Sequence, residues 1–255
     1  MMVWIRSALY WLGVLLTTPV FFIIALMVLP LPRRPRHWIV TRWTHIMLAW
    51  LKLTCGLRFR VIGAENIPST PSIVASKHQS GWETMALQQI FPAQVWVLKR
   101  ELLMLPFFGW ALATTSPIAI DRKRGLRASQ QLVQQGRDRL DCGFWIVVFP
   151  EGTRTQPGQR IKYKQGAAKM AIDLNVPLVP VAHNAGEFWP KNAFCKYPGE
   201  ITVVVGAPVV PDGRSTDAIT REIEEWIEAQ QLTISGVGPF ASEADRARRL
   251  ASHTH

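Results

Sequence analysis

Cysteine and acidic residues are scarce in this 255-residue chain. Its three cysteines, Cys55, Cys142 and Cys195, stand far apart, so the close pairs that zinc and redox motifs require are missing. We therefore expect reduced thiols and no bound metal. The chain has only 18 Asp and Glu but 29 Lys and Arg, which gives a formal net charge of +11 and favours anionic partners. Nucleic-acid motifs and internal repeats are also absent, so we expect phosphorylated substrates or acidic lipids rather than nucleic acid.

Charged side chains are missing from Ser7 to Pro32, a run long enough to span a bilayer. A cleaved signal peptide fits less well, because the run is long and no clear small-residue cleavage site precedes the arginines. Pro19 lies in the middle of the run and allows either a kinked span or a shallow insertion. The positive charges that follow place the downstream chain on the cytoplasmic side; they are Arg33, Arg34, Arg36 and Arg42.

The stretch from Trp38 to Leu57 repeats apolar residues at helical spacing and predicts an amphipathic helix. Helices of this kind commonly pack on a soluble core. The three tryptophans of this one, and its place beside the apolar run, favour a position at the membrane interface instead. We therefore expect residues 1–57 to form a membrane-associated helical element.

From residue 58 onward, short apolar segments alternate with helical ones. Strands are predicted at 58–61, 72–75, 95–98, 117–120, 144–149, 178–182 and 201–205. Helices are predicted at 82–90, 126–140, 164–174 and 217–231. The alternation indicates an α/β fold with a mixed, largely parallel sheet flanked by helices. We assign residues 58–234 to this domain and expect the polar segment 235–255 to be loosely ordered.

Residues suited to catalysis gather first in the run from Ser76 to Thr84. A histidine titrates near neutrality, so His78 can take a proton from an alcohol if a carboxylate such as Glu83 fixes its tautomer. Five positions along one helix would turn the two side chains about 140° apart, so they meet only if a turn intervenes. A short strand before His78 and a capping-box pattern from Ser80 to Glu83 provide that turn. In the simpler alternative, Glu83 only caps the helix and His78 is a solvated loop residue.

A second signal follows the apolar strand that ends at Phe149. Proline ends the strand, Gly152 permits a tight turn, and the turn presents Thr153 and Arg154. The planar guanidinium can donate two parallel hydrogen bonds to a phosphate, and loop amides and the threonine hydroxyl can add more. The same residues also fit a plain surface turn with a local ion pair between Glu151 and Arg154.

Taken in order, four blocks resemble the motifs of the glycerophospholipid acyltransferase family, most closely those of its bacterial 1-acyl-sn-glycerol-3-phosphate (lysophosphatidic acid) acyltransferases. The blocks are Lys77–Thr84, Leu98–Leu102 leading to Pro106–Trp110, Phe149–Arg154 and Val176–Val181, with a shorter element at Ile120–Arg122. The resemblance covers roughly residues 60 to 210. Many family members have aspartate where this chain has Glu83. A glutamate-bearing branch of the family exists, and the longer side chain keeps the carboxylate.

The resemblance implies transfer of an acyl chain from acyl-CoA or acyl carrier protein to the free sn-2 hydroxyl of lysophosphatidic acid, giving phosphatidic acid in phospholipid biosynthesis. His78 and Glu83 would be the catalytic residues, with His78 as general base and Glu83 orienting its ring. No cofactor would be bound. The enzyme would sit at the bacterial inner membrane, among membrane lipids, with its catalytic domain facing the cytoplasm. The expected substrate-binding residues, Arg154 foremost for the phosphate, are Lys99, Arg100, Arg122, Glu151, Gly152, Thr153 and Arg154.

Three alternatives stay open. Ser80 as a nucleophile is a rival mechanism, although no Gly-x-Ser-x-Gly elbow surrounds it. The acceptor could be another lysolipid or a lipid A precursor, although the loop from Glu151 to Arg154 favours a small phosphorylated one. A non-catalytic, basic membrane-binding protein would have no need of the arrangement around His78.

Overall fold

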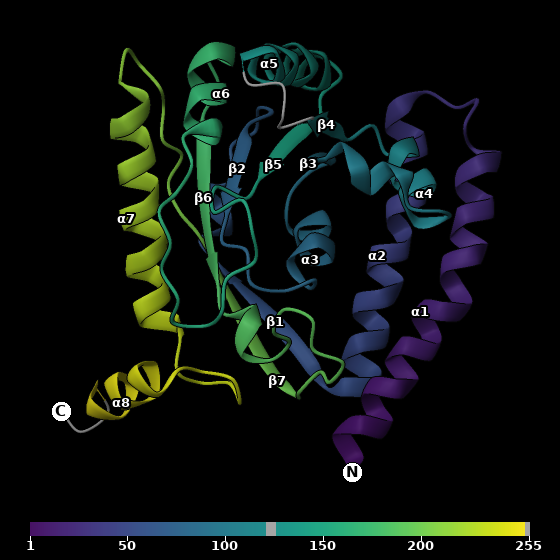
Figure 1. Ribbon diagram of the computed structural model, residues 1–255, viewed down its shortest axis with the longest axis vertical. Helices are drawn as coiled ribbons and strands as arrows, with labels where there is room; N and C mark the ends of the chain where they lie inside the picture. Colours follow the sequence, from purple (N-terminus) through teal and green to yellow (C-terminus); the bar gives the residue numbers. More distant parts are fainter. Residues whose placement is uncertain (121–125, 253–255) are drawn as a thin grey trace.

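A seven-stranded sheet forms the centre of the computed structural model, which describes residues 1–120 and 126–252 (Figure 1). The strands lie in the order β1-β7-β6-β2-β5-β3-β4, and each neighbouring pair is parallel except β6 with β7. The predicted mixed, largely parallel sheet is therefore confirmed. The strands are β1 (Leu57–Ile62), β2 (Ile73–Ser76), β3 (Gln94–Lys99), β4 (Ile118–Ile120), β5 (Trp145–Val148), β6 (Leu178–His183) and β7 (Gly199–Val205).

Helices cover both faces of this sheet. They are α1 (Met2–Met27), α2 (Arg33–Cys55), α3 (Glu83–Ile90), α4 (Phe108–Thr114), α5 (Leu126–Asp141), α6 (Gly166–Leu174), α7 (Thr216–Ile234) and α8 (Glu243–Ser252). Short 3-10 turns are η1 (Ala64–Asn66), η2 (Arg100–Met104) and η4 (Ala185–Glu187). The predicted helices are all present, whereas α4 and α8 were not expected from the sequence.

Both faces of the central strands are buried, which explains why these strands read as continuous apolar runs. Successive strand residues point to opposite faces. On β2, Val74 packs into the cluster that contains α2 and α3, whereas Ile73 and Ala75 pack into the cluster that contains α6 and α7. The loops that follow β2 and β5, and the end of β3, carry the candidate site.

Helix α1 lies at the edge of the molecule, against α2 and α4 (Figure 1). By length and composition it is long and apolar enough to cross a membrane. Only 11% of its most apolar 18-residue stretch is buried in the protein. The helix runs unbroken through Pro19. Gly13 allows a close approach of α2, because a Cβ there would lie 2.2 Å from Trp50 Nε1. That indole donates a hydrogen bond to the Leu9 carbonyl at 3.0 Å.

Helix α2 belongs to the main core as well as to the N-terminal hairpin. Met47, Leu48 and Leu51 are buried in the same cluster as the central strands. Trp43 and Trp50, both half-buried, direct their indole N–H groups to α1, so two of the three tryptophans that favoured the membrane interface pack against the neighbouring helix. Helix α2 therefore shares one core with the central strands, and the membrane-associated role of residues 1–57 stays a prediction.

Lys196 fastens α1 to the α/β domain. Its amine is enclosed by aromatic rings, lying 3.7 Å from the ring centroid of Trp11 and 4.5 Å from that of Trp189. Burial lowers the pKa of Lys196 to about 7. Its backbone N–H donates to Ser7 Oγ at 2.9 Å. These contacts hold the first turns of α1 at a fixed place on the domain.

The prediction of a loosely ordered tail is wrong for the described part of residues 235–255. Helix α8 begins with a reciprocal cap, in which Ser242 Oγ accepts from the Asp245 N–H at 3.1 Å and donates to Asp245 Oδ2 at 2.6 Å. Upstream, the Glu187 carboxylate accepts from the N–H groups of Gly236, Val237 and Gly238 at 2.7, 3.0 and 2.9 Å. The polar composition misled the prediction because these groups bond to the protein rather than to water.

Candidate active site

Three loops that follow parallel strands meet at one edge of the sheet. His78 follows β2, the loop from Glu151 to Arg154 follows β5, and Lys99 ends β3. Strand β5 lies between the other two and is parallel to both, so the three carboxyl ends lie side by side. Open α/β sheets commonly bind ligands at this edge.

His78 and Glu83 meet in the turn that the sequence predicted. His78 Nδ1 lies 2.8 Å from Glu83 Oε1, and the two side chains are 15% and 0% exposed. The same carboxylate oxygen accepts from the backbone N–H groups of Gln79 and Ser80 at 3.0 and 2.8 Å. Because a carboxylate only accepts, the hydrogen of the neutral imidazole sits on Nδ1. Nε2 has no hydrogen-bond partner among the described residues.

Glu83 remains ionised despite complete burial. Burial on its own raises the pKa of this carboxyl, but the hydrogen bond from His78, the charges of His183 and His78 and the Ser80 N–H together bring the pKa below its ordinary value. The predicted capping box is formed only in part. Glu83 does reach back to the Ser80 N–H, but Ser80 Oγ accepts from the Trp82 N–H at 3.1 Å and not from that of Glu83.

An aromatic stack fixes the plane of the imidazole. The His78 ring lies on Phe149 with centroids 3.8 Å apart and an interplanar angle of 12°. Phe149 in turn stacks on Trp96 of β3 at 5.7 Å. Neither aromatic residue was given a role from the sequence, because their strands are distant in the chain. Phe149 is the first residue of the recognised block Phe149–Arg154, and that position was the one sign in the sequence that could have marked it as a site residue.

Glu151 holds the loop that carries His78, which is called the histidine loop below. Its side chain is fully buried, and Oε2 accepts from the His78 backbone N–H at 2.7 Å. Oε1 lies 2.8 Å from Lys77 Nζ and accepts from Thr155 Oγ1 at 3.0 Å. Burial raises the pKa of Glu151, and the Lys77 ammonium opposes the rise. The alternative ion pair with Arg154 is not formed; Glu151 bonds to the loop that carries His78 instead.

Helix α7 completes this anchor. Lys77, 1% exposed, also pairs with Glu228 of α7 at 2.7 Å. Glu228 accepts a second hydrogen bond from the Tyr163 hydroxyl at 2.9 Å. Lys77 and Glu228 were not predicted as site residues, and no local pattern announces a contact between positions 151 residues apart.

Arg154 lies in the loop that follows β5. Its guanidinium is partly exposed and has no hydrogen bond or ion pair within the described ranges. Thr153 is exposed beside it. Gly152 has φ +73°, and a Cβ there would lie 2.7 Å from Lys164 Nζ, so a second cation lies against the same turn. An unpaired guanidinium and a nearby ammonium are suited to an anion.

The other predicted cations lie at the same edge or outside the described residues. Lys99 and Arg100 are exposed at the end of β3, and neither has a hydrogen bond or ion pair in the described part of the chain. The described residues stop at Ile120, which is paired with Lys99, and resume at residue 126, so the prediction for Arg122 falls outside them. The substrate-binding roles of all these residues stay predictions.

The arrangement suits proton abstraction more than attack by serine. His78 has one nitrogen tied to an ionised carboxylate and the other free to accept a proton. Ser80 is fully buried, and its oxygen accepts from a backbone N–H. No cluster of His, Cys, Asp and Glu suited to a metal occurs in residues 1–120 and 126–252.

Comparison with known proteins gives consistent matches. The family model described as "Acyltransferase" matches residues 58–184. A 1-acyl-sn-glycerol-3-phosphate acyltransferase of Pseudomonas aeruginosa is 40% identical over 238 residues, 91% of this chain and 93% of that protein. The human 1-acyl-sn-glycerol-3-phosphate acyltransferase alpha is 31% identical over 192 residues, 74% of this chain and 68% of that protein.

The fold also matches a solved structure. The crystal structure of the 1-acyl-sn-glycerophosphate acyltransferase of Thermotoga maritima superposes with a TM-score of 0.74 at 22% sequence identity. The match covers 89% of this chain and 93% of the other. At this identity the likeness concerns the fold.

Proposed function

Because this chain belongs to the glycerophospholipid acyltransferase family, we propose that it acylates the sn-2 hydroxyl of 1-acyl-sn-glycerol-3-phosphate to give phosphatidic acid. One observation carries the proposal: His78 is held by a buried, ionised Glu83 through Nδ1 and has a free Nε2, while the loop after the neighbouring strand β5 carries Arg154, which has no partner among the described residues. The names of the bacterial and human relatives support the choice of acceptor.

In the proposed reaction, His78 Nε2 takes the hydrogen of the acceptor hydroxyl while Nδ1–H stays bonded to Glu83. The oxygen attacks the carbonyl carbon of the thioester, and the C–S bond breaks as the tetrahedral intermediate collapses. The thiolate leaves and takes the proton from the imidazolium. Glu83 stabilises the imidazolium because its negative charge lies 2.8 Å from Nδ1 in a fully buried position.

The acceptor phosphate is assigned to the cations that surround this edge. Arg154 is the first choice, because no acid among the described residues pairs with its guanidinium and would compete with the phosphate. Lys164 supports the same turn, and Lys99 lies at the end of β3. Arg122 keeps the role assigned to it from the sequence. The acyl donor is a thioester of coenzyme A or of acyl carrier protein.

The proposal includes attachment to the bacterial inner membrane through α1, with the domain on the cytoplasmic side. Exposed apolar residues of α1 support it. Phe22 of α1 packs against Trp110 of α4 and against Phe107, the residue before α4, so α4 continues the apolar surface. Leu15 and Leu16 on α1 are 69% and 62% exposed, as expected of a helix that contacts lipid. The arginines after α1 follow the positive-inside tendency.

The test is release of free thiol by the purified full-length protein. We expect lysophosphatidic acid with acyl-CoA or acyl carrier protein to give thiol and phosphatidic acid in equal amounts, and His78→Ala to abolish both. A lipid A precursor or phosphate-free lysolipid that reacts faster than lysophosphatidic acid would reassign the acceptor. Binding to acidic vesicles without thiol release from either donor would indicate a non-catalytic membrane protein.

A further inference from the structure

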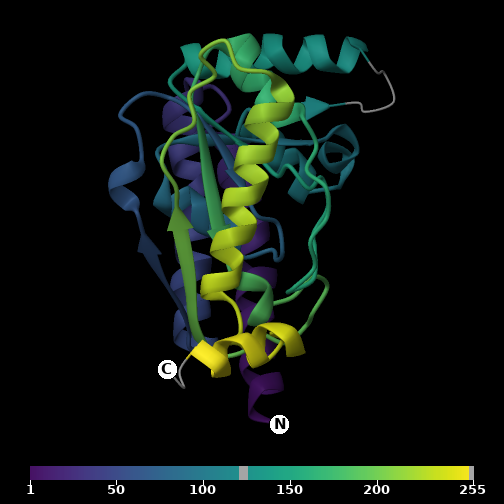
Figure 2. The same cartoon turned by 90° about the vertical axis from the view of Figure 1, so that its left-hand side faces the viewer.

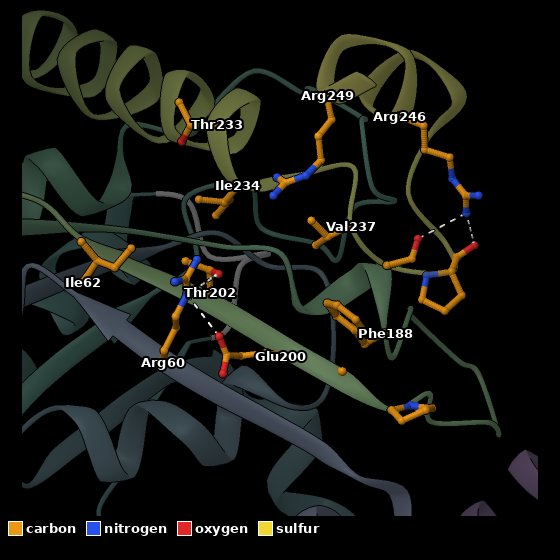
Figure 3. A pocket seen from close by; sticks show the side chains of 14 residues that line it. Arg60, Ile62, Phe188, Glu200, Thr202, Thr233, Ile234, Val237, Arg246 and Arg249 are labelled. Carbon is orange, nitrogen blue, oxygen red and sulfur yellow. Dashed lines mark hydrogen bonds and ion pairs between the residues drawn. The ribbon is translucent and has the colours of Figure 1, made fainter. Parts of the chain in front are cut away.

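A cavity that His78 and Glu83 do not line lies between the sheet and the C-terminal segment (Figure 3). Its volume is about 800 Å³. Strands β1 and β7 form its floor, with Arg60 and Thr202. Helix α8 forms its roof, with Arg246 and Arg249. The reaction derived above uses none of these residues.

The cavity carries an excess of positive charge. Three arginines line it against one acid, Glu200, which pairs with Arg60 at 3.3 Å. Arg246 donates only to backbone carbonyls, including that of Gly238 at 3.2 Å. Arg249 makes a single long contact of 3.5 Å with the Ser235 carbonyl. Within the described chain, neither Arg246 nor Arg249 is neutralised by an acid, so an anion can bind both without displacing a protein carboxylate.

The remaining walls suit an organic body attached to that anion. Phe188, Ile234 and Val237 face the cavity beside the arginines (Figure 3). The amides of residues 236–238 are already bonded to Glu187, so the arginine side chains are the free donors. A phosphate ester with a flat or apolar portion therefore fits better than a bare inorganic ion.

The position of the cavity favours a water-soluble ligand over a bilayer lipid. Helices α7 and α8 lie on the side of the molecule opposite α1 in both Figure 1 and Figure 2. If α1 contacts the membrane, the cavity opens toward the aqueous side. Within the sheet, β7 is separated from β2 by one strand, so the floor of the cavity and the strand that precedes His78 are about 10 Å apart.

Hydrogen bonds connect the walls of the cavity to the histidine loop. Asn184 accepts from the Thr202 N–H at 2.9 Å and donates to the Ile234 carbonyl at 2.9 Å. Gln231 donates to the His183 carbonyl at 3.0 Å and accepts from Gln79 Nε2 at 3.0 Å. A ligand in the cavity is thus held in a fixed relation to the residues that flank His78.

We propose that this cavity binds the phosphorylated nucleotide end of coenzyme A, with Arg246 and Arg249 contacting its phosphate groups. The pantetheine arm is longer than the roughly 10 Å between the cavity floor and the strand that precedes His78, so the thioester can lie near His78. The choice of coenzyme A rests on the proposed function, because acyl-CoA is one of the two donors named there. The recognition of a phosphate ester rests on the cavity alone.

Calorimetric titration of adenosine 3′,5′-bisphosphate into the full-length protein in detergent tests the site without requiring acyl transfer. We expect binding that weakens at least about tenfold in Arg249→Ala and less in Arg249→Lys. The matched control is Arg248→Ala, which lies on the same helix, pairs with Asp245 and does not line the cavity. It should bind within about twofold of the wild type. Unchanged melting temperatures show that the variants are folded.

Two probes separate the possible sources of the phosphate. Adenosine without phosphate should bind far more weakly than the bisphosphate. If glycerol 3-phosphate, and not the bisphosphate, shows binding that depends on Arg249, the cavity takes a lipid headgroup and the nucleotide assignment is wrong. If neither probe distinguishes Arg249→Ala from Arg248→Ala, the phosphate site itself is refuted.

A kinetic measurement connects the site to the reaction. In Arg249→Ala, the KM for acyl-CoA should rise about tenfold while the KM for lysophosphatidic acid is unchanged. Should the wild type bind the bisphosphate through Arg249 yet release no thiol, the proposed function fails and the binding site remains. Should it release thiol with an unchanged KM for acyl-CoA in the variant, the nucleotide assignment fails and the proposed function remains.

Discussion

Replacing Glu151 by glutamine distinguishes a residue that binds substrate from one that positions the catalytic loop. The sequence placed Glu151 among the substrate-binding residues, whereas its carboxylate bonds to the His78 N–H, to Lys77 and to Thr155. Removing its charge leaves the buried Lys77 ammonium with Glu228 alone. We therefore expect effects on stability and turnover rather than on acceptor binding.

The size of the effect follows from the burial of this pair. Breaking a buried ion pair typically costs about 3–5 kcal/mol, and Glu228 at 2.7 Å keeps Lys77 partly compensated, so we expect about 3 kcal/mol for Glu151→Gln. For a chain of this length, that loss corresponds to a fall in Tm of about 6–12 °C. The turnover number should fall at least about tenfold, because the His78 backbone loses a charged acceptor, while the KM for lysophosphatidic acid stays within about twofold.

The double variant Lys77→Met with Glu151→Gln supplies a sharper test. Removing both charges eliminates the unpaired ammonium and leaves Glu228, 13% exposed, with its hydrogen bond from Tyr163, so part of the lost stability should return. Turnover should remain low, because the charged anchor of His78 is still missing. Thermal melting and thiol release measure the two effects, and Glu225→Gln on the exposed side of α7 controls for loss of one acidic charge. An unchanged Tm with a tenfold higher KM in Glu151→Gln would refute the positioning role and restore direct acceptor binding.

Four further predictions address the base, the phosphate site, the membrane surface and the pH dependence. His78→Ala should lower turnover at least about a hundredfold with an unchanged Tm; near-normal thiol release would remove the general base. Arg154→Ala should cost about 2–4 kcal/mol in kcat/KM for lysophosphatidic acid, with Arg154→Lys intermediate, whereas equal losses on a phosphate-free lysolipid would make the role structural. Leu16→Lys on α1 should weaken partitioning into liposomes while the similarly exposed Leu232→Lys on α7 does not, and equal partitioning of both would contradict attachment through α1. Burial lowers the pKa of His37 to about 4, below its unfolded value of about 6.5, so neutral His37 stabilises the fold above pH 6.5 and about 3 kcal/mol is lost as the pH falls toward 4. Denaturant unfolding of His37→Gln across this window should show a correspondingly smaller loss, and parallel curves would rule out His37 as the source.

The contact between α7 and the histidine loop shows which features of the site could not be predicted from the sequence. The turn between His78 and Glu83 was predictable, because the spacing is short and the residues before and after it have strong local preferences. The contact between Lys77 and Glu228 was not, since it joins residues far apart in the chain and neither stands in a motif. Glu151 was recognised as a site residue, but its bond to Lys77 was not specified, because a local pairing with Arg154, the open alternative, fits the same sequence.

The sequence by itself determined the elements whose cause is local. Apolar runs broken by proline and glycine defined the strands, charge-free residues defined α1, and the ordered blocks indicated the family and the pair of His78 with Glu83. Only the tertiary structure decided which strands are neighbours, which tryptophans of α2 pack on α1, how the polar tail folds into α8, and that this helix roofs a cavity lined by arginines. These features depend on contacts between distant segments, whose free energy comes from burial and from pairing of buried polar groups. Composition and periodicity indicate that a residue will be buried or hydrogen-bonded, but they do not indicate which residue it will contact.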